Sequence, residues 1–246
     1  MSGTSADVVE VESSAHIQLA FCEPLAHPDL VTRGFFPHKV GGAPAWLDPA
    51  ATPAADALCC GNCGKKMAFM LQIYAPRRNV AAAFHRALYV FACKAGGCND
   101  APGAQAVVRS QLPLANPYYV ADMADARDGP EGELNAAVLT PDELEGKVCL
   151  ICRAVPAKRC GKCSAVAYCG RHHQADDWAR GHAAECGTLA GASSSAADGG
   201  HIVVAERSGV SPFVFPEHEL VMEAEEDVAA DAAVDEPSDD LVAATT

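Results

Sequence analysis

A chain of 246 residues with 50% hydrophobic residues is long enough for one domain of ordinary size or two small ones. None of its apolar stretches approaches the ~20 residues that a membrane span requires, so no membrane partner is expected. The N-terminal sequence MSGTSADVVEVESSAH is acidic and lacks a secretory signal pattern. This favours metal sites over disulfides for the 12 cysteines, in a reducing compartment, the cytoplasm or the nucleus.

The net charge of −14 is concentrated in one stretch of the chain. Residues 217–240 contain 11 Asp or Glu and no Lys or Arg, which leaves 18 basic and 32 − 11 = 21 acidic residues elsewhere, a balance of −3. Nucleic-acid binding usually draws on a dominant basic surface, which this chain lacks. Direct nucleic-acid binding is therefore not expected.

The chain begins with a polar segment, residues 1–18, that is expected to be disordered. Residues 19–120 are interpreted as an N-terminal, β-rich, zinc-binding part. Within it, the Gly- and Pro-containing segment 30–47 predicts an ordered loop. Its aromatic side chains are expected to be buried anchors: Phe35, Phe36 and Trp46.

Three strands are predicted in this part. Aromatic and β-branched residues with partial alternation indicate strands over 67–75 and 84–92. A further strand is indicated over 106–113, where Pro113 ends it. The many alanines leave a helix over 80–91 open as an alternative.

The rest of the chain divides by composition into five segments. Thr140, Pro141 and Glu143 together predict a helix start within the first of them. The segments are a linker (121–147), a zinc finger (148–186), a flexible linker (187–210), a short return segment of the body (211–224) and an acidic disordered tail (225–246).

Eight metal-type residues occupy 38 positions of the finger segment. Two Cys-x-x-Cys pairs can each present two thiolates to one ion, and Cys/His pairs four positions apart share one face of a helix. HHQADDWARGHAAEC predicts that helix, and eight ligands imply two zinc ions. His172 adjoins His173, but the spacing from Cys169 favours His173. The ligands are Cys149, Cys152, Cys160, Cys163, Cys169, His173, His182 and Cys186.

A second group of cysteines lies nearer the N-terminus. Cys60 and Cys63 form a Cys-x-x-Cys in CCGNCG, and Cys93 and Cys98 form a wider pair in ACKAGGC. Together they predict a Cys₄ site for a third zinc ion. Two alternatives remain: Cys59 instead of Cys60 as the ligand, and ordinary buried thiols instead of a metal site. A thioredoxin-type redox pair is disfavoured because a strand, and not a helix, is predicted to follow CCGNCG.

The finger segment, ending in YCGRHHQADDWARGHAAEC, resembles the MYND zinc finger over residues 149–186. In that fold the ligands interleave along the chain. The resemblance therefore implies one zinc held by Cys149, Cys152, Cys169 and His173. It implies another held by Cys160, Cys163, His182 and Cys186. All the ligand positions are then filled, so the zinc ions are expected to be structural.

The flanking sequence is similar to the programmed cell death protein 2 family over most of residues 30–227. The similar stretches are FFPHKVGGAPAWL (35–47), CGNCGKKMAFMLQIYAP (60–76), FHRALYVFAC (84–93), VVRSQLP (107–113) and FVFPEHELVMEAEED (213–227). The resemblance implies an α+β fold: a β-rich, zinc-stapled body with an inserted, cross-braced MYND finger that ends in a helix, and a disordered acidic tail. Family members continue into a further C-terminal half, which is expected to be missing from this sequence.

The same resemblance implies a function. The family is understood as a dedicated chaperone for a small-subunit ribosomal protein of the S5 type (Rps2 in eukaryotes) during 40S assembly. The expected partner is therefore a basic ribosomal protein, which the acidic stretch 217–240 could attract, unless that stretch only keeps the chain soluble.

The residues bear on two other function classes. An enzyme is not expected, because no catalytic nucleophile, placed base or open metal position is evident. The alternative function is that of a MYND-type adaptor binding proline-containing peptides of transcriptional regulators, with its groove near Trp178.

Overall fold

The computed structural model describes residues 17–98, 100–119, 147–195, 204–205, 207–226 and 228. Its contacts divide the chain into two units, Cys22–Glu219 and the two chain ends, Met1–Phe21 with Leu220–Thr246. Several sequence predictions lie outside or almost wholly outside the described residues. They are the disordered start (1–18), the linker (121–147) with its helix after Thr140, and the acidic tail (225–246).

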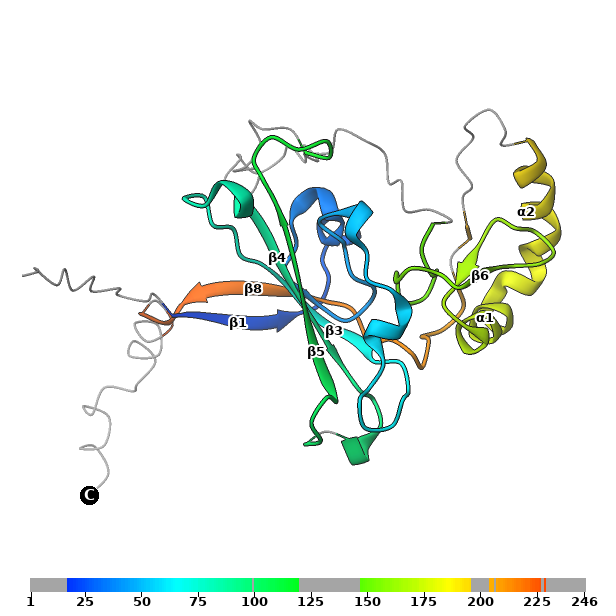
Figure 1. Ribbon diagram of the computed structural model, residues 1–246, viewed down its shortest axis with the longest axis horizontal. Coiled ribbons are helices and arrows are strands. Elements are labelled where there is room, and N and C mark those ends of the chain that lie inside the picture. Colours follow the sequence, from blue (N-terminus) through cyan, green and yellow to red (C-terminus); the bar gives the residue numbers. More distant parts are fainter. Residues whose placement is uncertain are drawn as a thin grey trace, which may run out of the picture. The chain divides into compact units, whose positions relative to one another are not determined.

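The fold is sheet-rich and α+β, as expected, and its six-stranded sheet has the order β1-β8-β2-β3-β4-β5. Figure 1 labels all of these strands except β2. Strands β2 to β5 pair antiparallel with their neighbours in that order. The bounds of the six strands are β1 Gln18–Glu23, β2 Lys39–Val40, β3 Ala68–Tyr74, β4 His85–Ala92, β5 Gln105–Leu112 and β8 His218–Ala224.

The three strands predicted from the sequence correspond to β3, β4 and β5. The helix left open over 80–91 is wrong, because β4 alternates strictly between buried and half-buried residues from His85 to Ala92. Because successive side chains of a strand point to opposite faces, this alternation places one face of β4 against the core. Short 3-10 turns connect the strands, at Pro28–Val31, Arg33–Phe35, Pro49–Ala51, Ala55–Leu58, Ala81–Ala83 and Gly96–Cys98.

Aromatic side chains form the core of the body. Trp46 lies with its ring centroid 4.5 Å from that of Tyr89, and Phe36 lies 4.7 Å from Tyr74. The Tyr89 hydroxyl accepts a hydrogen bond from the Leu47 amide, so its polar end is satisfied in the interior. Trp46 and Phe36 are buried as expected, whereas Phe35 is only half-buried.

The return segment meets the sheet beside Gly41 and Gly42, the two residues that follow β2. Both have left-handed φ, 68° and 64°, and a Cβ on Gly41 would lie 1.9 Å from the carbonyl oxygen of Pro216. Only glycine allows the two backbones to approach so closely. The pairing that follows joins Lys39 with Glu219 and Val40 with His218.

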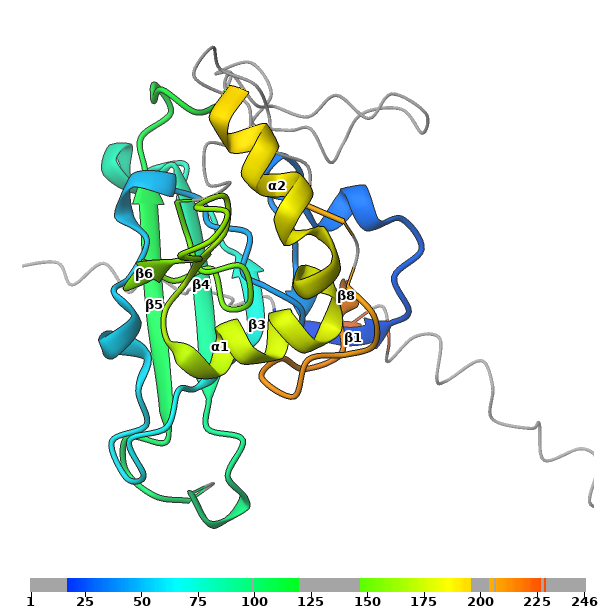
Figure 2. The ribbon, with the colours of Figure 1, turned by 90° about the vertical axis from the view of Figure 1, so that its right-hand side faces the viewer.

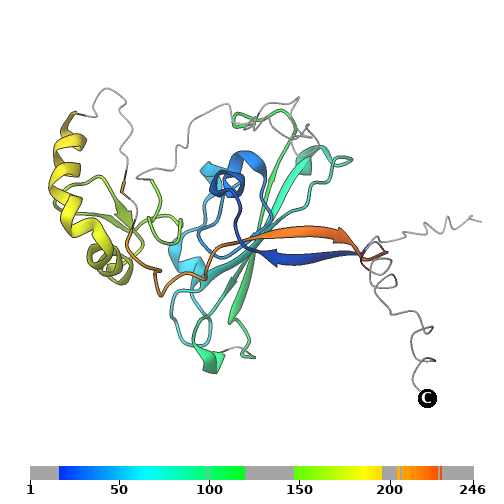
Figure 3. The same ribbon diagram turned by 180° about the vertical axis from the view of Figure 1, so that it is seen from behind.

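In the other unit, β1 and β8 are neighbouring strands, which Figure 3 shows side by side. The pairing continues just beyond both strands, where the Glu225 amide donates to the Ile17 carbonyl at 3.0 Å.

No helix in the described part of the chain is long and apolar enough to cross a membrane.

The finger consists of a small hairpin followed by helices (Figure 2). Its elements are β6 Lys158–Arg159, β7 Ala167–Tyr168, α1 Arg171–Asp177, a π-helical turn Trp178–His182 and α2 Ala183–Ser195.

The flexible linker predicted to start at residue 187 differs from the structure, because α2 continues to Ser195. Ala and Leu favour a helix here, and Leu189 is buried in the finger core beside Cys186. The burial of one apolar side chain thus extends the helix beyond the last predicted ligand.

Candidate metal centres

The structure brings the predicted ligands together in three clusters of four. Within each cluster, the nitrogen and sulfur atoms that could bind a metal all lie within 4.8 Å of one another. The clusters are Cys60, Cys63, Cys93 and Cys98 (the N-terminal cluster); Cys149, Cys152, Cys169 and His173 (the first finger cluster); and Cys160, Cys163, His182 and Cys186 (the second finger cluster).

One Cys-x-x-Cys pair in each cluster has the same backbone geometry. The residue after the second cysteine is left-handed, with φ values of 67°, 54° and 56° in chain order. Its amide donates to the carbonyl of the first cysteine at 2.9 Å in all three. This tight turn places both sulfurs on one side. The left-handed residues are Gly64, Arg153 and Ser164, and the accepting cysteines are Cys60, Cys149 and Cys160.

The N-terminal cluster uses Cys60 and not its neighbour Cys59. Cys59 Sγ instead lies 3.1 Å from Lys66 Nζ, outside the cluster. Hydrogen bonds from the backbone of Cys63 and then Asn62 lower the pKa of Cys60 to about 7, against the effect of its burial. Asn62 also donates its side-chain amide to Cys98 Sγ at 3.2 Å. The surroundings of Cys60 thus favour its thiolate, the form that binds metal, whereas, against a hydrogen bond from the Ala95 backbone, burial and the neighbouring thiols raise the pKa of Cys93 to about 11.

In the first finger cluster, His173 faces the sulfurs with Nδ1. That nitrogen lies 3.1 Å from Cys169 Sγ and 3.4 Å from Cys149 Sγ. Burial alone would lower the pKa of His173, but these two side chains raise it to about 9. His172 is exposed and is not part of the cluster, because neighbouring residues on a helix point in different directions and His173 is the one that faces the sulfurs.

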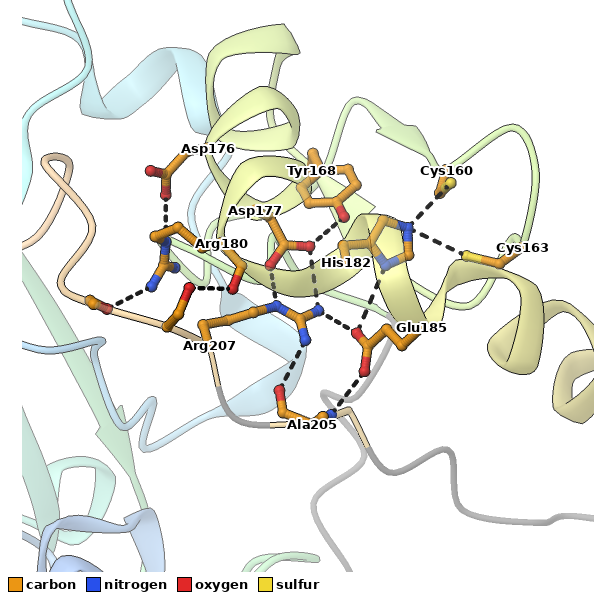
Figure 4. Close-up of polar contacts among 12 residues, drawn as sticks. Cys160, Cys163, Tyr168, Asp176, Asp177, Arg180, His182, Glu185, Ala205 and Arg207 are labelled. Carbon is orange, nitrogen blue, oxygen red and sulfur yellow. Dashed lines mark hydrogen bonds and ion pairs between the residues drawn. The ribbon is translucent and has the colours of Figure 1, made fainter.

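In the second finger cluster, His182 faces the sulfurs with Nε2, at 3.3 Å from Cys160 and 3.7 Å from Cys163 (Figure 4). Burial opposes ionisation of Cys160, yet hydrogen bonds from the Cys163 backbone and then from His182 lower its pKa to about 6. All four side chains of this cluster are buried. The π-helical turn supplies His182, and the first turns of α2 supply Cys186.

The donor sets fit zinc. Four thiol or imidazole groups converge at each cluster, and zinc takes four sulfur or nitrogen ligands in a tetrahedron. When bound, zinc replaces the shared thiol protons and joins segments distant in sequence, so its binding energy becomes folding energy. Four protein ligands fill the tetrahedron, which describes a structural and not a catalytic ion.

Sequence reasoning missed the polar groups around the second finger cluster. Asp177 is completely buried and accepts a hydrogen bond of 2.6 Å from the Tyr168 hydroxyl. Arg207, from the linker between α2 and the return segment, forms an ion pair with Asp177 and another with Glu185 (Figure 4). Of these contacts, the sequence could have indicated only that of Glu185, which follows the candidate ligand His182 by three positions on a helix and so lies on the same face.

Comparisons with known proteins agree with this architecture. Residues 16–126 match the family model of the Programmed cell death protein 2, N-terminal domain, and residues 149–186 match the MYND finger. A curated relative from Bos taurus, Programmed cell death protein 2, is 35% identical over 218 residues, which is 88% of this chain and 58% of the relative. The same-named protein from Rattus norvegicus is 34% identical over 193 residues, 78% of this chain and 51% of the relative.

The chain belongs to the programmed cell death protein 2 family. A human protein, Programmed cell death protein 2-like, is 41% identical over a shorter stretch of 75 residues, 30% of this chain and 19% of the relative. The chain spans between half and three fifths of the length of the curated relatives that match it over most of its residues. No solved structure matches it. Family and finger together indicate a zinc-binding interaction protein.

Proposed function

We propose that this chain escorts a basic small-subunit ribosomal protein of the S5 type during assembly of the 40S subunit, in the cytoplasm, the nucleus or both. The observation that carries the proposal is the match to the Programmed cell death protein 2, N-terminal domain over residues 16–126 together with the MYND finger over 149–186. The role of chaperone comes from the resemblance to that family.

The charge of the chain supports a basic client. Of the 32 acidic residues, 11 lie in residues 217–240, where no Lys or Arg intervenes. An unassembled ribosomal protein exposes a surface that normally contacts RNA and is rich in Lys and Arg. Electrostatic complementarity of this kind speeds encounter and selects partners.

The metal clusters support binding and not catalysis. Each cluster supplies four protein ligands, which leaves no coordination position for a substrate or an activated water. The zinc ions therefore have a structural role, and partner binding falls to the protein surfaces that they stabilise.

Co-expression tests this proposal. The chain is expressed with an S5-type ribosomal protein, and separately with another small-subunit protein of similar size and charge. We expect the S5-type protein alone to remain soluble and to co-elute with the chain in size-exclusion chromatography. Equal recovery of both clients would show a general charge effect and reject an S5-specific escort.

A second candidate is an adaptor that binds proline-containing peptides of transcriptional regulators. The observation that favours it is Trp178, which is 43% exposed on the finger with its ring 5.6 Å from that of His182. Exposed aromatic side chains commonly contact proline-rich ligands. Tight binding of such a peptide, lost in W178A, without retention of a ribosomal protein, would favour this function over the first.

A further inference from the structure

The linker between α2 and the return segment places a buried arginine against the finger. Arg207 has only 9% of its side chain exposed and donates through Nε to Asp177, which is completely buried. Its Nη2 lies 3.3 Å from the other oxygen of Asp177 and 2.5 Å from Glu185 Oε1. One guanidinium thus forms ion pairs with two carboxylates (Figure 4). The match to the MYND finger ends at residue 186, well before this arginine.

Glu185 in turn faces a zinc-ligand candidate. Its Oε1 lies 3.7 Å from Nδ1 of His182, whose side chain is fully buried. Among the described residues, this Nδ1 has no hydrogen-bond partner. The other oxygen of Glu185 accepts from the Ala205 amide at 3.0 Å, so the linker contacts both oxygens of the carboxylate, one through this amide and one through Arg207. Glu185 Oε1 has no hydrogen-bond partner among the described residues either, so its ion pair with Arg207 holds it near the histidine.

The two finger histidines differ in which nitrogen they offer. His173 faces its sulfurs with Nδ1, whereas His182 faces its sulfurs with Nε2. A histidine that binds a metal through Nε2 must carry its proton on Nδ1. A carboxylate beside Nδ1 holds that tautomer, fixes the plane of the ring and makes Nε2 a stronger donor. Within the described part of the chain, only His182 has such an ion-pair partner.

We propose that Glu185 and Arg207 are positioning residues of the second finger cluster, so that the linker between α2 and the return segment completes this zinc site from outside the finger. Arg207 holds the Glu185 carboxylate, and the carboxylate holds His182. The residues that the finger needs to hold this zinc then include Arg207, beyond its last ligand, Cys186. Zinc retention at this cluster depends on a segment that otherwise leads back to the sheet of the body.

The test measures zinc release cluster by cluster in the zinc-loaded full chain. The protein is mixed with a chelator and N-ethylmaleimide, and alkylation of each cysteine is followed by mass spectrometry of its peptides. The variants are E185Q, which removes the charge but keeps the shape and leaves the Arg207–Asp177 pair, and R207M, which removes the guanidinium.

Arg180 offers a matched control. It contacts the same linker, donating to the Gly209 carbonyl at 3.0 Å, but pairs with Asp176 and not with the carboxylate at His182. R180M therefore loosens the segment without touching the Glu185–His182 contact.

We expect Cys160, Cys163 and Cys186 to be alkylated about 10- to 100-fold faster in E185Q and R207M, the usual loss on removing an outer partner of a metal ligand. The other two clusters should react at the wild-type rate, and R180M should resemble wild type throughout. Unchanged rates in E185Q would overturn the proposal. So would acceleration of all three clusters together, or equal acceleration in R180M. If R207M does not fold, because Asp177 is left unpaired, E185Q alone decides.

Discussion

The indole Nε1–H of Trp46 donates a 2.8 Å hydrogen bond to the carbonyl of Arg153, joining the sheet to the first Cys-x-x-Cys turn of the finger. Near it, the Val155 amide donates to the Pro53 carbonyl at 3.0 Å, and Ala154 is buried in the core of the body. The start of the finger is therefore packed into the body. Zinc binding at this turn and folding of the core should depend on each other.

Replacing Trp46 by phenylalanine tests that dependence. W46F keeps a buried ring but leaves the Arg153 carbonyl without its donor, and an unsatisfied buried acceptor costs about 1–3 kcal/mol. We expect the free energy of unfolding to fall by about that amount, measured by urea denaturation. W178F changes an indole that is 43% exposed and should have little effect. Equal losses in the two variants would contradict the role given to Trp46.

A second prediction concerns the shared Cys-x-x-Cys turn. Gly64 has φ of 67° and open space where a Cβ would lie, so G64A would meet strain from the backbone alone. A left-handed conformation costs a residue with a Cβ about 1–2 kcal/mol. G64A should lower stability by that amount, measured by thermal unfolding of zinc-loaded protein. Gly96 also has open space but no left-handed φ, so G96A should be nearly neutral. A neutral G64A would count against the turn geometry described for this cluster.

Local sequence was enough to predict the metal ligands and the main strands. Ligand spacing is a local property, and all twelve ligand candidates that it indicated lie in clusters of four. The division of the finger ligands between two clusters came from the resemblance to the MYND finger and not from spacing. The strands were recognisable because β4 carries its period of two within eight residues. Contacts between distant segments were not recognisable. Lys39 pairs with Glu217 from 178 positions away, and Arg207 reaches Asp177 across 30 positions. No spacing rule connects such residues.

The extent of α2 could not be predicted for a related reason. The segment GTLAGASSS carries glycines and serines that suggest a linker, but Leu189 is buried against the finger core. Tertiary burial overrides weak local propensity. Between Cys59 and Cys60, the spacing to Cys63 favoured Cys60 and left Cys59 as an alternative, and the turn geometry of the structure directs Cys60 to the cluster and Cys59 to Lys66.

The third prediction tests the close approach at Gly41. A Cβ there would lie 1.9 Å from the Pro216 carbonyl oxygen, which no side-chain movement can relieve. G41A should therefore separate the return segment from β2 and expose the amides of the β2–β8 pairing to hydrogen exchange. Gly209 has nearly the same φ, 66°, with nothing near its side-chain position. G209A thus carries the backbone strain without the clash. Faster exchange of Lys39 and Glu219 in G41A alone would isolate the effect of the clash, and equal exchange in both variants would refute it.

The fourth prediction is the zinc content. Three clusters of four ligands should bind three zinc ions per chain, measured by elemental analysis of purified protein. C63S should leave two, since it removes one of the N-terminal ligands. C152S should unfold the finger as well as remove its zinc, because metal binding supplies the folding energy of so small a unit. A finger that keeps its circular dichroism after zinc removal by a chelator would contradict a structural role for the ions.

The last prediction concerns pH and the buried Lys39, which is only 3% exposed and is paired with Glu217. Burial lowers the pKa of Lys39 below 10.5, although the Glu217 carboxylate opposes the shift. Between the lowered pKa and 10.5 the unfolded chain binds more protons than the folded one, so the free energy of unfolding should rise with pH in that window. Below the lowered pKa, Lys39 is protonated in both the folded and the unfolded chain. The full cost of burying its charge then lowers the free energy of unfolding.

Urea unfolding of wild type and K39M at several pH values up to 10.5 measures this effect. K39M removes the titrating group, so the difference in unfolding free energy between wild type and K39M should move in favour of wild type as the pH rises. K65M, which removes an exposed lysine, controls for the loss of one positive charge. A difference that stays constant over the window would mean that Glu217 fully offsets the burial of Lys39. The ion pair that ties β2 to the return segment would then cost no stability through desolvation.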